Sequence, residues 1–200
     1  MRIESLFPTP VGFFSLDRKL SSDEEAFLVN QETCANENNL VSVDRYILDR
    51  ESMKELKDFV QNCVDEYFKF IFSPKYETKL RLTQSWTNYT KPGQSHHKHS
   101  HANSFVSGVF YIKANKDSDK IYFYRDLSNQ RLTITQNEFN LWNSSSWWFN
   151  VGVGGLILFP SWLTHSVETV QGNDTRISLA FNTFPVGVLG EENLLTALKI

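Results

Sequence analysis

The chain has 200 residues, which fits one ordinary domain large enough to bury a substantial core. Its formal net charge is −3 and its basic residues are scattered, so we expect neither a nucleic-acid partner nor binding to a membrane surface. No stretch reaches the roughly 18 apolar residues of a membrane span, and residues 1–20 lack the pattern of a secretory signal. With only Cys34 and Cys63, no disulfide framework is expected. These features predict a reduced, cytoplasmic protein.

The N-terminal part predicts one strand and a short helix. Residues 3–16 alternate loosely between apolar and polar side chains and include Pro8 and Pro10, which is typical of an edge strand. An edge of this kind allows a homodimer. Residues 22–25 (SDEE) have the spacing of a capping box, so we expect a helix from there to about residue 33.

A second helix is predicted over residues 49–72. Its apolar residues recur at helical spacing, which predicts one face buried against the core. This stripe consists of Met53, Leu56, Val60, Cys63, Val64, Tyr67 and Ile71. Pro74 ends the helix, because the residue before a proline is disfavoured in helical conformation.

After Pro74 the pattern changes to segments rich in β-branched and aromatic residues, separated by Gly, Asn, Asp and Pro. We predict strands at residues 79–89, 105–113, 119–125, 130–135, 155–160, 164–170 and 175–183. Helices followed by many strands indicate an α+β chain that is mainly β. We expect the helices to pack on one face of a β-sandwich or barrel, whose mouth would suit a metal site.

A histidine-rich segment is the strongest candidate for a site. Four of the five histidines fall within residues 95–101, and the fifth, His165, follows a strand-like segment that ends at Pro160. Because residues i and i+2 of a strand face the same side, three pairs have suitable spacing. They are His97–His99, His99–His101 and His101–Asn103. The imidazole of His165 would complete a metal site, although a polar loop and a structural histidine would explain the same residues.

Arg176 and Ser178 form the second candidate. On a strand they share one face, which is the barrel interior if Ile177 and Leu179 face outward. A buried arginine needs an anion. A structural ion pair with an Asp or Glu would satisfy it, and so would a ligand carboxylate gripped by the guanidinium and the hydroxyl. Beside a metal, the second arrangement indicates a cosubstrate with an acid tail.

Several short segments, in the same order along nearly the whole chain, carry a family resemblance. They are LFPTPV (residues 6–11), QSWTNY (84–89), His99-x-His101-x-Asn103-Ser104, SGVFY (107–111), and GLILFPSW (155–162) leading to His165 and Arg176-x-Ser178. The sequence resembles the iron(II)- and 2-oxoglutarate-dependent oxygenases, and more narrowly an oxygenase group of bacteria and bacteriophages. The resemblance implies a double-stranded β-helix, the cupin-like jelly roll, with the N-terminal helices packed on one sheet.

The resemblance also implies the site. His99 matches the first metal histidine and His165 the distal one, with Fe(II) as the metal and 2-oxoglutarate as the cosubstrate. The far carboxylate of the cosubstrate is assigned to Arg176, Ser178, Tyr111 and Tyr89. For Tyr89 we favour the alternative of core packing with a satisfied hydroxyl. No catalytic side chain is implied beyond the metal site.

His101 departs from the common pattern. Most of the superfamily has a carboxylate at this position, which gives two histidines and one acid. Here either three histidines hold the iron, or only His99 and His165 do and water completes the coordination. A neutral triad leaves Fe(II) with its full charge, which favours anionic ligands.

The implied activity is that of a dioxygenase that hydroxylates a small molecule or an amino-acid side chain, with release of succinate and CO2. Two alternatives stay open: a three-histidine cupin metalloenzyme that does not use 2-oxoglutarate, and a non-catalytic jelly-roll binding module. We expect one domain over residues 1–200, made of an N-terminal strand and helices (1–75), a jelly-roll core (76–185) and a C-terminal tail (186–200). A cytoplasmic location would be the host cytoplasm if the chain is encoded by a phage.

Overall fold

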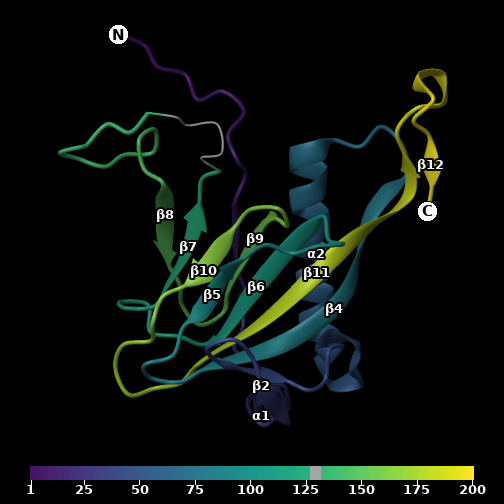
Figure 1. Cartoon of the computed structure of the whole chain (residues 1–200). Helices are drawn as coiled ribbons and strands as arrows, with labels where there is room; N and C mark the ends of the chain where they lie inside the picture. The colour runs from purple at the N-terminus through teal and green to yellow at the C-terminus, as the bar shows by residue number, and fades with distance from the viewer. Residues whose placement is uncertain (127–131) are drawn as a thin grey trace.

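Two β-sheets facing each other form the body of the protein, as Figure 1 shows in the computed structural model. The structure describes residues 1–126 and 132–200. The larger sheet has the strand order β1-β9-β6-β11-β4-β3-β2, with β12 beside β11, and the smaller sheet has the order β5-β10-β7-β8. Neighbouring strands within both sheets pair antiparallel. This mainly β arrangement confirms the predicted jelly roll.

The strands of the larger sheet are β1 (Gly12–Ser15), β2 (Thr33–Ala35), β3 (Leu40–Ser42), β4 (Thr78–Thr90), β6 (Val106–Lys113), β9 (Gly155–Pro160), β11 (Arg176–Leu189) and β12 (Leu198–Lys199). Those of the smaller sheet are β5 (His96–His99), β7 (Lys120–Tyr124), β8 (Ser146–Asn150) and β10 (His165–Val167). The α-helices are α1 (Ser22–Val29) and α2 (Lys54–Phe72), and short 3₁₀ turns lie at Ile47–Asp49, Glu51–Met53 and Glu192–Leu194. None of the helices in the described residues is long and apolar enough to pass through a lipid bilayer.

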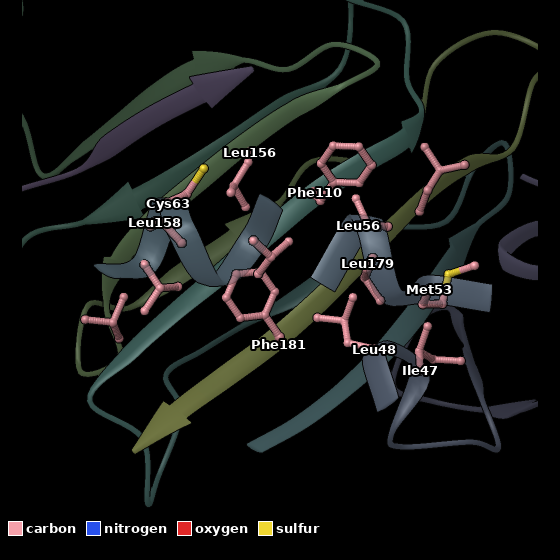
Figure 2. Close-up of a cluster of buried hydrophobic side chains, with 14 of the residues drawn as sticks. Ile47, Leu48, Met53, Leu56, Cys63, Phe110, Leu156, Leu158, Leu179 and Phe181 are labelled. Carbon is pink, nitrogen blue, oxygen red and sulfur yellow. The ribbon is translucent and has the colours of Figure 1, made fainter. Parts of the chain in front are cut away.

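The hydrophobic core has two parts, one on each face of the larger sheet. On the outer face, α2 packs its buried stripe on β6, β9 and β11. Figure 2 shows Leu56 and Cys63 of this helix near Phe110 and Phe181 of the sheet. The second part lies between the two sheets and includes Tyr111, Ile121, Phe123, Ile157 and Phe159. Helix packing on one sheet is therefore confirmed, and it leaves the other face of that sheet for the site.

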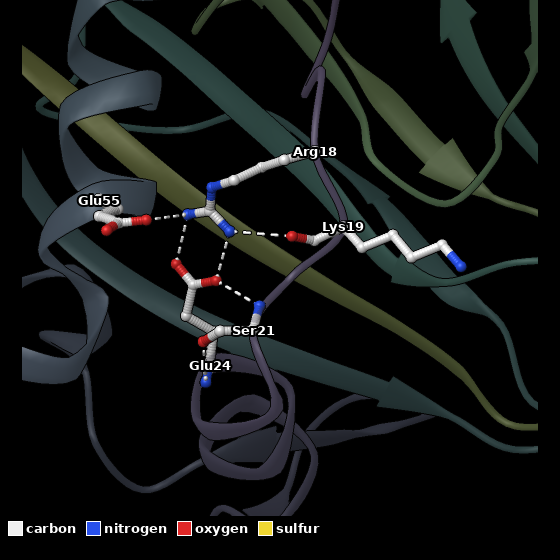
Figure 3. Close-up of polar contacts among 5 residues, drawn as sticks. All are labelled: Arg18, Lys19, Ser21, Glu24 and Glu55. Carbon is white, nitrogen blue, oxygen red and sulfur yellow. Dashed lines mark hydrogen bonds and ion pairs between the residues drawn. The ribbon is translucent and has the colours of Figure 1, made fainter.

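A capping box begins α1, one residue earlier than the sequence predicted. The Ser21 hydroxyl accepts from the Glu24 backbone N–H at 3.1 Å, and the Glu24 carboxylate accepts from the Ser21 backbone N–H at 2.7 Å. Arg18 selects this register because its guanidinium donates to both carboxylate oxygens of Glu24 at 2.6 and 2.7 Å. It also lies 3.2 Å from the carboxylate of Glu55 on α2 (Figure 3). The helix ends at Val29, so the predicted end near residue 33 is wrong.

The second helix is shorter than predicted at its start. Residues 47–53 form two 3₁₀ turns, separated by Arg50 in an extended conformation (ψ 141°), and α2 begins only at Lys54. It ends where Ser73 adopts a left-handed conformation with φ 42°. The apolar stripe was predicted correctly for its central residues, because Leu56, Val60 and Val64 are fully buried.

The strand prediction is incomplete, because β2, β3, β5, β8 and β12 lie outside the predicted ranges and one predicted strand is not found among the described residues. The predicted strand at 130–135 lies partly outside the described residues, and residues 132–135 form no strand. Instead β8 pairs with β7 and becomes the edge of the smaller sheet. Only Gly12–Ser15 of the predicted 3–16 strand is paired, since the prolines before it lack the N–H that a ladder needs. At the other end, β11 continues to Leu189, past the predicted core boundary at 185.

Candidate metal centre

Three histidines from two segments of the chain converge between the sheets. His99, His101 and His165 each present a ring nitrogen, and these atoms lie within 4.8 Å of one another. His99 ends β5 directly opposite His165, which begins β10. His101 follows the end of β5, and its backbone N–H donates to the Ser161 carbonyl at 2.9 Å. The chain therefore places the three imidazoles at one point, as a metal site requires.

Hydrogen bonds fix two of these rings in the form that binds a metal. The Nδ1 atom of His99 lies 2.9 Å from the His97 carbonyl oxygen, and Nδ1 of His165 lies 3.1 Å from the Leu163 carbonyl oxygen. A carbonyl only accepts, so each Nδ1 carries the proton and each Nε2 keeps its lone pair free. A backbone carbonyl on the second ring nitrogen is typical of metal-binding histidines.

Burial keeps the three rings neutral. It lowers the pKa of His165 to about 3 and that of His101 to about 4, and the neighbouring imidazole of His99 acts in the same direction. The pKa of His99 is lowered by burial too. Metal ligands must be unprotonated, and imidazole nitrogen suits a first-row metal such as Fe(II). The donor set therefore fits iron without needing a carboxylate.

A small cavity of about 40 Å³ lies beside the triad. Its lining includes the three imidazoles, Tyr111 of β6, Ser178 of β11 and the apolar side chains of Ile121 and Phe159. On β11, Ser178 and Ala180 face this cavity, whereas Ile177 and Leu179 pack under the helices. This alternation agrees with the face that the sequence predicted for Ser178.

Unpartnered polar atoms lie in and near the cavity, which Tyr111 and Asn88 line and Arg176 does not. Tyr111 Oη, Asn88 Oδ1 and Arg176 Nη1 are buried and find no hydrogen-bond partner in the described part of the chain. Such groups are rare because each costs about 1–3 kcal/mol. Arg176 lies 3.8 Å from an Asp119 oxygen, close enough for an ion pair but too far for a hydrogen bond. A ligand carboxylate would supply the missing acceptor for Tyr111 and Arg176.

Arg176 lies between the small cavity and a larger cleft. Its side chain is almost fully buried but lines a larger cleft of about 1270 Å³, not the small cavity. Lys113 and Asp119 share this lining.

The pKa of Tyr111 is raised by burial, so its hydroxyl keeps its proton and is able to donate.

Tyr89 is not brought to the histidines. Its side chain lies on the helix side of β4, in the outer core. Its hydroxyl donates to the Leu28 carbonyl at 2.5 Å and accepts from the Thr87 hydroxyl at 3.1 Å. Strand alternation explains this, since Asn88 is the residue that lines the cavity. The geometry agrees with the core-packing alternative.

The cavity lining also contains His96, Trp86 and Asn88, which the sequence did not assign to the site. Trp86 and Asn88 share one face of β4, which alternation would have shown once its inner face was known. His96 could not have been found in this way. It pairs with Val167 while His99 pairs with His165, so β5 contains one extra residue there, and this bulge turns His96 inward.

A jelly roll that gathers three neutral imidazoles beside unpartnered buried donors defines a candidate non-haem metal centre. Residues 84–182 match the model of the family described as "Putative 2OG-Fe(II) oxygenase". This match covers 99 of the 200 residues and confirms the resemblance to the 2OG-Fe(II) oxygenases that was inferred from the sequence. The family is one of oxidoreductases, with Fe(II) and 2-oxoglutarate as metal and cosubstrate.

Solved structures agree with this assignment at the level of the fold. An oxidoreductase of the 2OG-Fe(II) oxygenase family from Burkholderia pseudomallei is 16% identical, over 80% of this chain and 74% of that one, with a TM-score of 0.57. The alpha-ketoglutarate-dependent epimerase SnoN from nogalamycin biosynthesis is 11% identical over 88% and 78%, with a TM-score of 0.62. HygX from Streptomyces hygroscopicus, with nickel, 2-oxoglutarate and hygromycin B bound, is 10% identical over 88% and 82%, with a TM-score of 0.59. No curated protein matches the chain by sequence.

Proposed function

We propose that this chain is a dioxygenase that hydroxylates a small molecule or an amino-acid side chain. The observation that carries the proposal is the convergence of His99, His101 and His165 beside a cavity that Tyr111 lines, with Arg176 buried nearby in the adjoining cleft. A dicarboxylate bound at the metal would bring its far carboxylate to these donors. Residues 1–200 would act as one domain, in the cytoplasm.

Each group has a separate task. The three imidazoles would hold Fe(II), with His99 and His165 kept in orientation by the carbonyls of His97 and Leu163. When bound, Fe(II) and 2-oxoglutarate supply the oxidation: one O2, the cosubstrate and a C–H bond give succinate, CO2 and an alcohol. This overall reaction balances without a proton transfer from a protein side chain.

Arg176 and Tyr111 would orient the cosubstrate by its far carboxylate, with Ser178 beside them. The guanidinium supplies charge and the phenol a directional donor. Ile121 and Phe159 narrow the cavity and limit the water that could reach the reacting end. HygX, which was solved with 2-oxoglutarate, supports this function by its fold.

The test is an anaerobic titration of Fe(II)-loaded protein with 2-oxoglutarate, followed by the visible metal-to-ligand charge-transfer band. We expect a saturable band in the wild type and a much weaker affinity in Arg176→Ala. Lys113→Ala, on the same larger cleft, is the matched control and should keep the wild-type affinity. Bound iron with no band at any cosubstrate concentration would contradict the proposal.

One observation favours a second candidate function. His101 occupies the position where most of the superfamily has a carboxylate, as in three-histidine cupin enzymes that do not use 2-oxoglutarate. That candidate predicts tight metal binding without a charge-transfer band, and no effect of Arg176→Ala on metal-dependent turnover. The same titration therefore separates the two functions.

A further inference from the structure

His96 is a fourth imidazole in the cavity and lies outside the triad. Its ring stacks on that of His99, with centroids 4.8 Å apart and an interplanar angle of 15°. It lines the same cavity as Tyr111 and Ser178. The bulge in β5 is what turns it inward, because regular alternation would put His96 and His99 on opposite faces.

Strand pairing places His96 between the triad and Arg176. Along β10, His165 pairs with His99, and Val167 pairs with His96. Farther along the same direction Val170 lines the larger cleft, whose lining also contains Arg176. A molecule that reached from the three imidazoles to Arg176 would therefore pass the ring of His96.

The ring of His96 has hydrogen-bonding capacity that the protein leaves unused. In the part of the chain that the structure describes, its contacts are with the neighbouring histidine rings, and none of its nitrogen atoms has a hydrogen bond. A neutral imidazole always carries one N–H donor. A donor that is held in a narrow cavity is well suited to a carboxylate oxygen.

We propose that His96 is a positioning residue that donates a hydrogen bond to the bound 2-oxoglutarate, midway between the metal ligands and Arg176. The inference rests on the proposed function. Its main rival is that His96 is itself a metal ligand, since His96, His97 and His99 form a second group of ring nitrogens within 4.8 Å.

The experiment compares three variants with the wild type: His96→Ala, His96→Gln and Lys98→Ala. Lys98 is the matched control, because it lies on the same strand, is exposed, and places its ammonium 4.0 Å from the centroid of the Tyr124 ring. Two dissociation constants are measured without oxygen, that of Fe(II) and that of 2-oxoglutarate on the iron-loaded protein. The unfolding temperature of each variant is recorded as a check of folding.

We expect His96→Ala to weaken 2-oxoglutarate binding about tenfold or more, with Fe(II) affinity within about twofold of wild type. His96→Gln keeps an N–H donor and should recover most of the loss, and Lys98→Ala should bind both ligands normally. Unchanged cosubstrate binding in His96→Ala would overturn the inference alone. So would a loss of Fe(II) binding, or a Gln variant no better than Ala. A wild type that binds Fe(II) but not 2-oxoglutarate would overturn the proposed function and this inference with it.

Discussion

Replacing Tyr111 with Phe should make the apoprotein more stable and the cosubstrate complex weaker. Tyr111 is 1% exposed, and its hydroxyl oxygen is buried without a partner among the described residues. Phe fills the same volume and removes the unpaired group. Since an unsatisfied buried hydroxyl costs about 1–3 kcal/mol, we expect a gain of about 1 kcal/mol in the free energy of unfolding. For a chain of this length that corresponds to roughly 2–4 °C in the unfolding temperature.

The same substitution removes a donor from the proposed carboxylate site. A hydrogen bond to a charged acceptor contributes about 1.5–3 kcal/mol, so the dissociation constant of 2-oxoglutarate should rise at least about tenfold. Calorimetric melting of the apoprotein and anaerobic titration of the iron-loaded protein measure the two effects separately.

Tyr89→Phe is the internal control for this prediction. The Tyr89 hydroxyl has two partners, so its removal should lower stability by about 1 kcal/mol and leave cosubstrate affinity unchanged. If Tyr111→Phe instead lowered stability while 2-oxoglutarate bound as before, the hydroxyl would be structural. The reasoning from unpartnered atoms would then be refuted.

Three other predictions concern the fold and the metal. Gly108→Ala should lower the free energy of unfolding by about 1–3 kcal/mol in urea titrations, because an added Cβ would lie 2.2 Å from the Phe181 ring; an unchanged midpoint would contradict that packing. Hydrogen bonds from Arg18 hold the pKa of Glu24 below its usual 4.5. The ionised carboxylate therefore stabilises the fold above pH 4.5, and this stabilisation is lost as the pH falls through the lowered pKa of the folded state. The stability deficit of Arg18→Met should therefore shrink between pH 6 and pH 2, and a constant deficit would exclude the linkage. His101→Ala should lose Fe(II) affinity in equilibrium dialysis and His101→Asp should restore it; equal binding by all forms would remove His101 from the coordination.

Local sequence rules predicted the parts of this molecule that follow a regular period. The buried stripe of α2 and the inward face of Ser178 both follow from spacing alone. The capping box is a feature that local rules predict only in part. Residues 21–25 read SSDEE, so Ser21 with Glu24 and Ser22 with Glu25 have the same spacing. The two hydrogen bonds from Arg18, which lies outside this four-residue pattern, favour the first pair.

In the candidate site, too, some residues could be predicted from the sequence and others depend on strand pairing. His99 and His165 could be proposed because the family resemblance matches them to the metal histidines, whereas spacing alone left three pairs open. His96 was not assigned to the site because nothing in the four residues of β5 indicates a bulge, which arises from pairing with β10. Strand β8 was missed for a related reason, since only its pairing with β7 distinguishes it from the polar turn before it.

The bulge in β5 has a consequence for how this segment tolerates insertions and deletions during evolution. In a regular strand, losing one residue reverses every side chain beyond that point, whereas losing two restores the original orientation. Here the extra residue already offsets the alternation, so a single deletion between His96 and His99 would produce an ordinary strand. That strand would still pair with β10, and the two histidines, then two residues apart, would face the same side, whereas loss of both intervening residues would put them on opposite faces. The number of residues between His96 and His99 therefore decides whether both rings face the cavity, and a comparison of substitutions alone would not show this constraint.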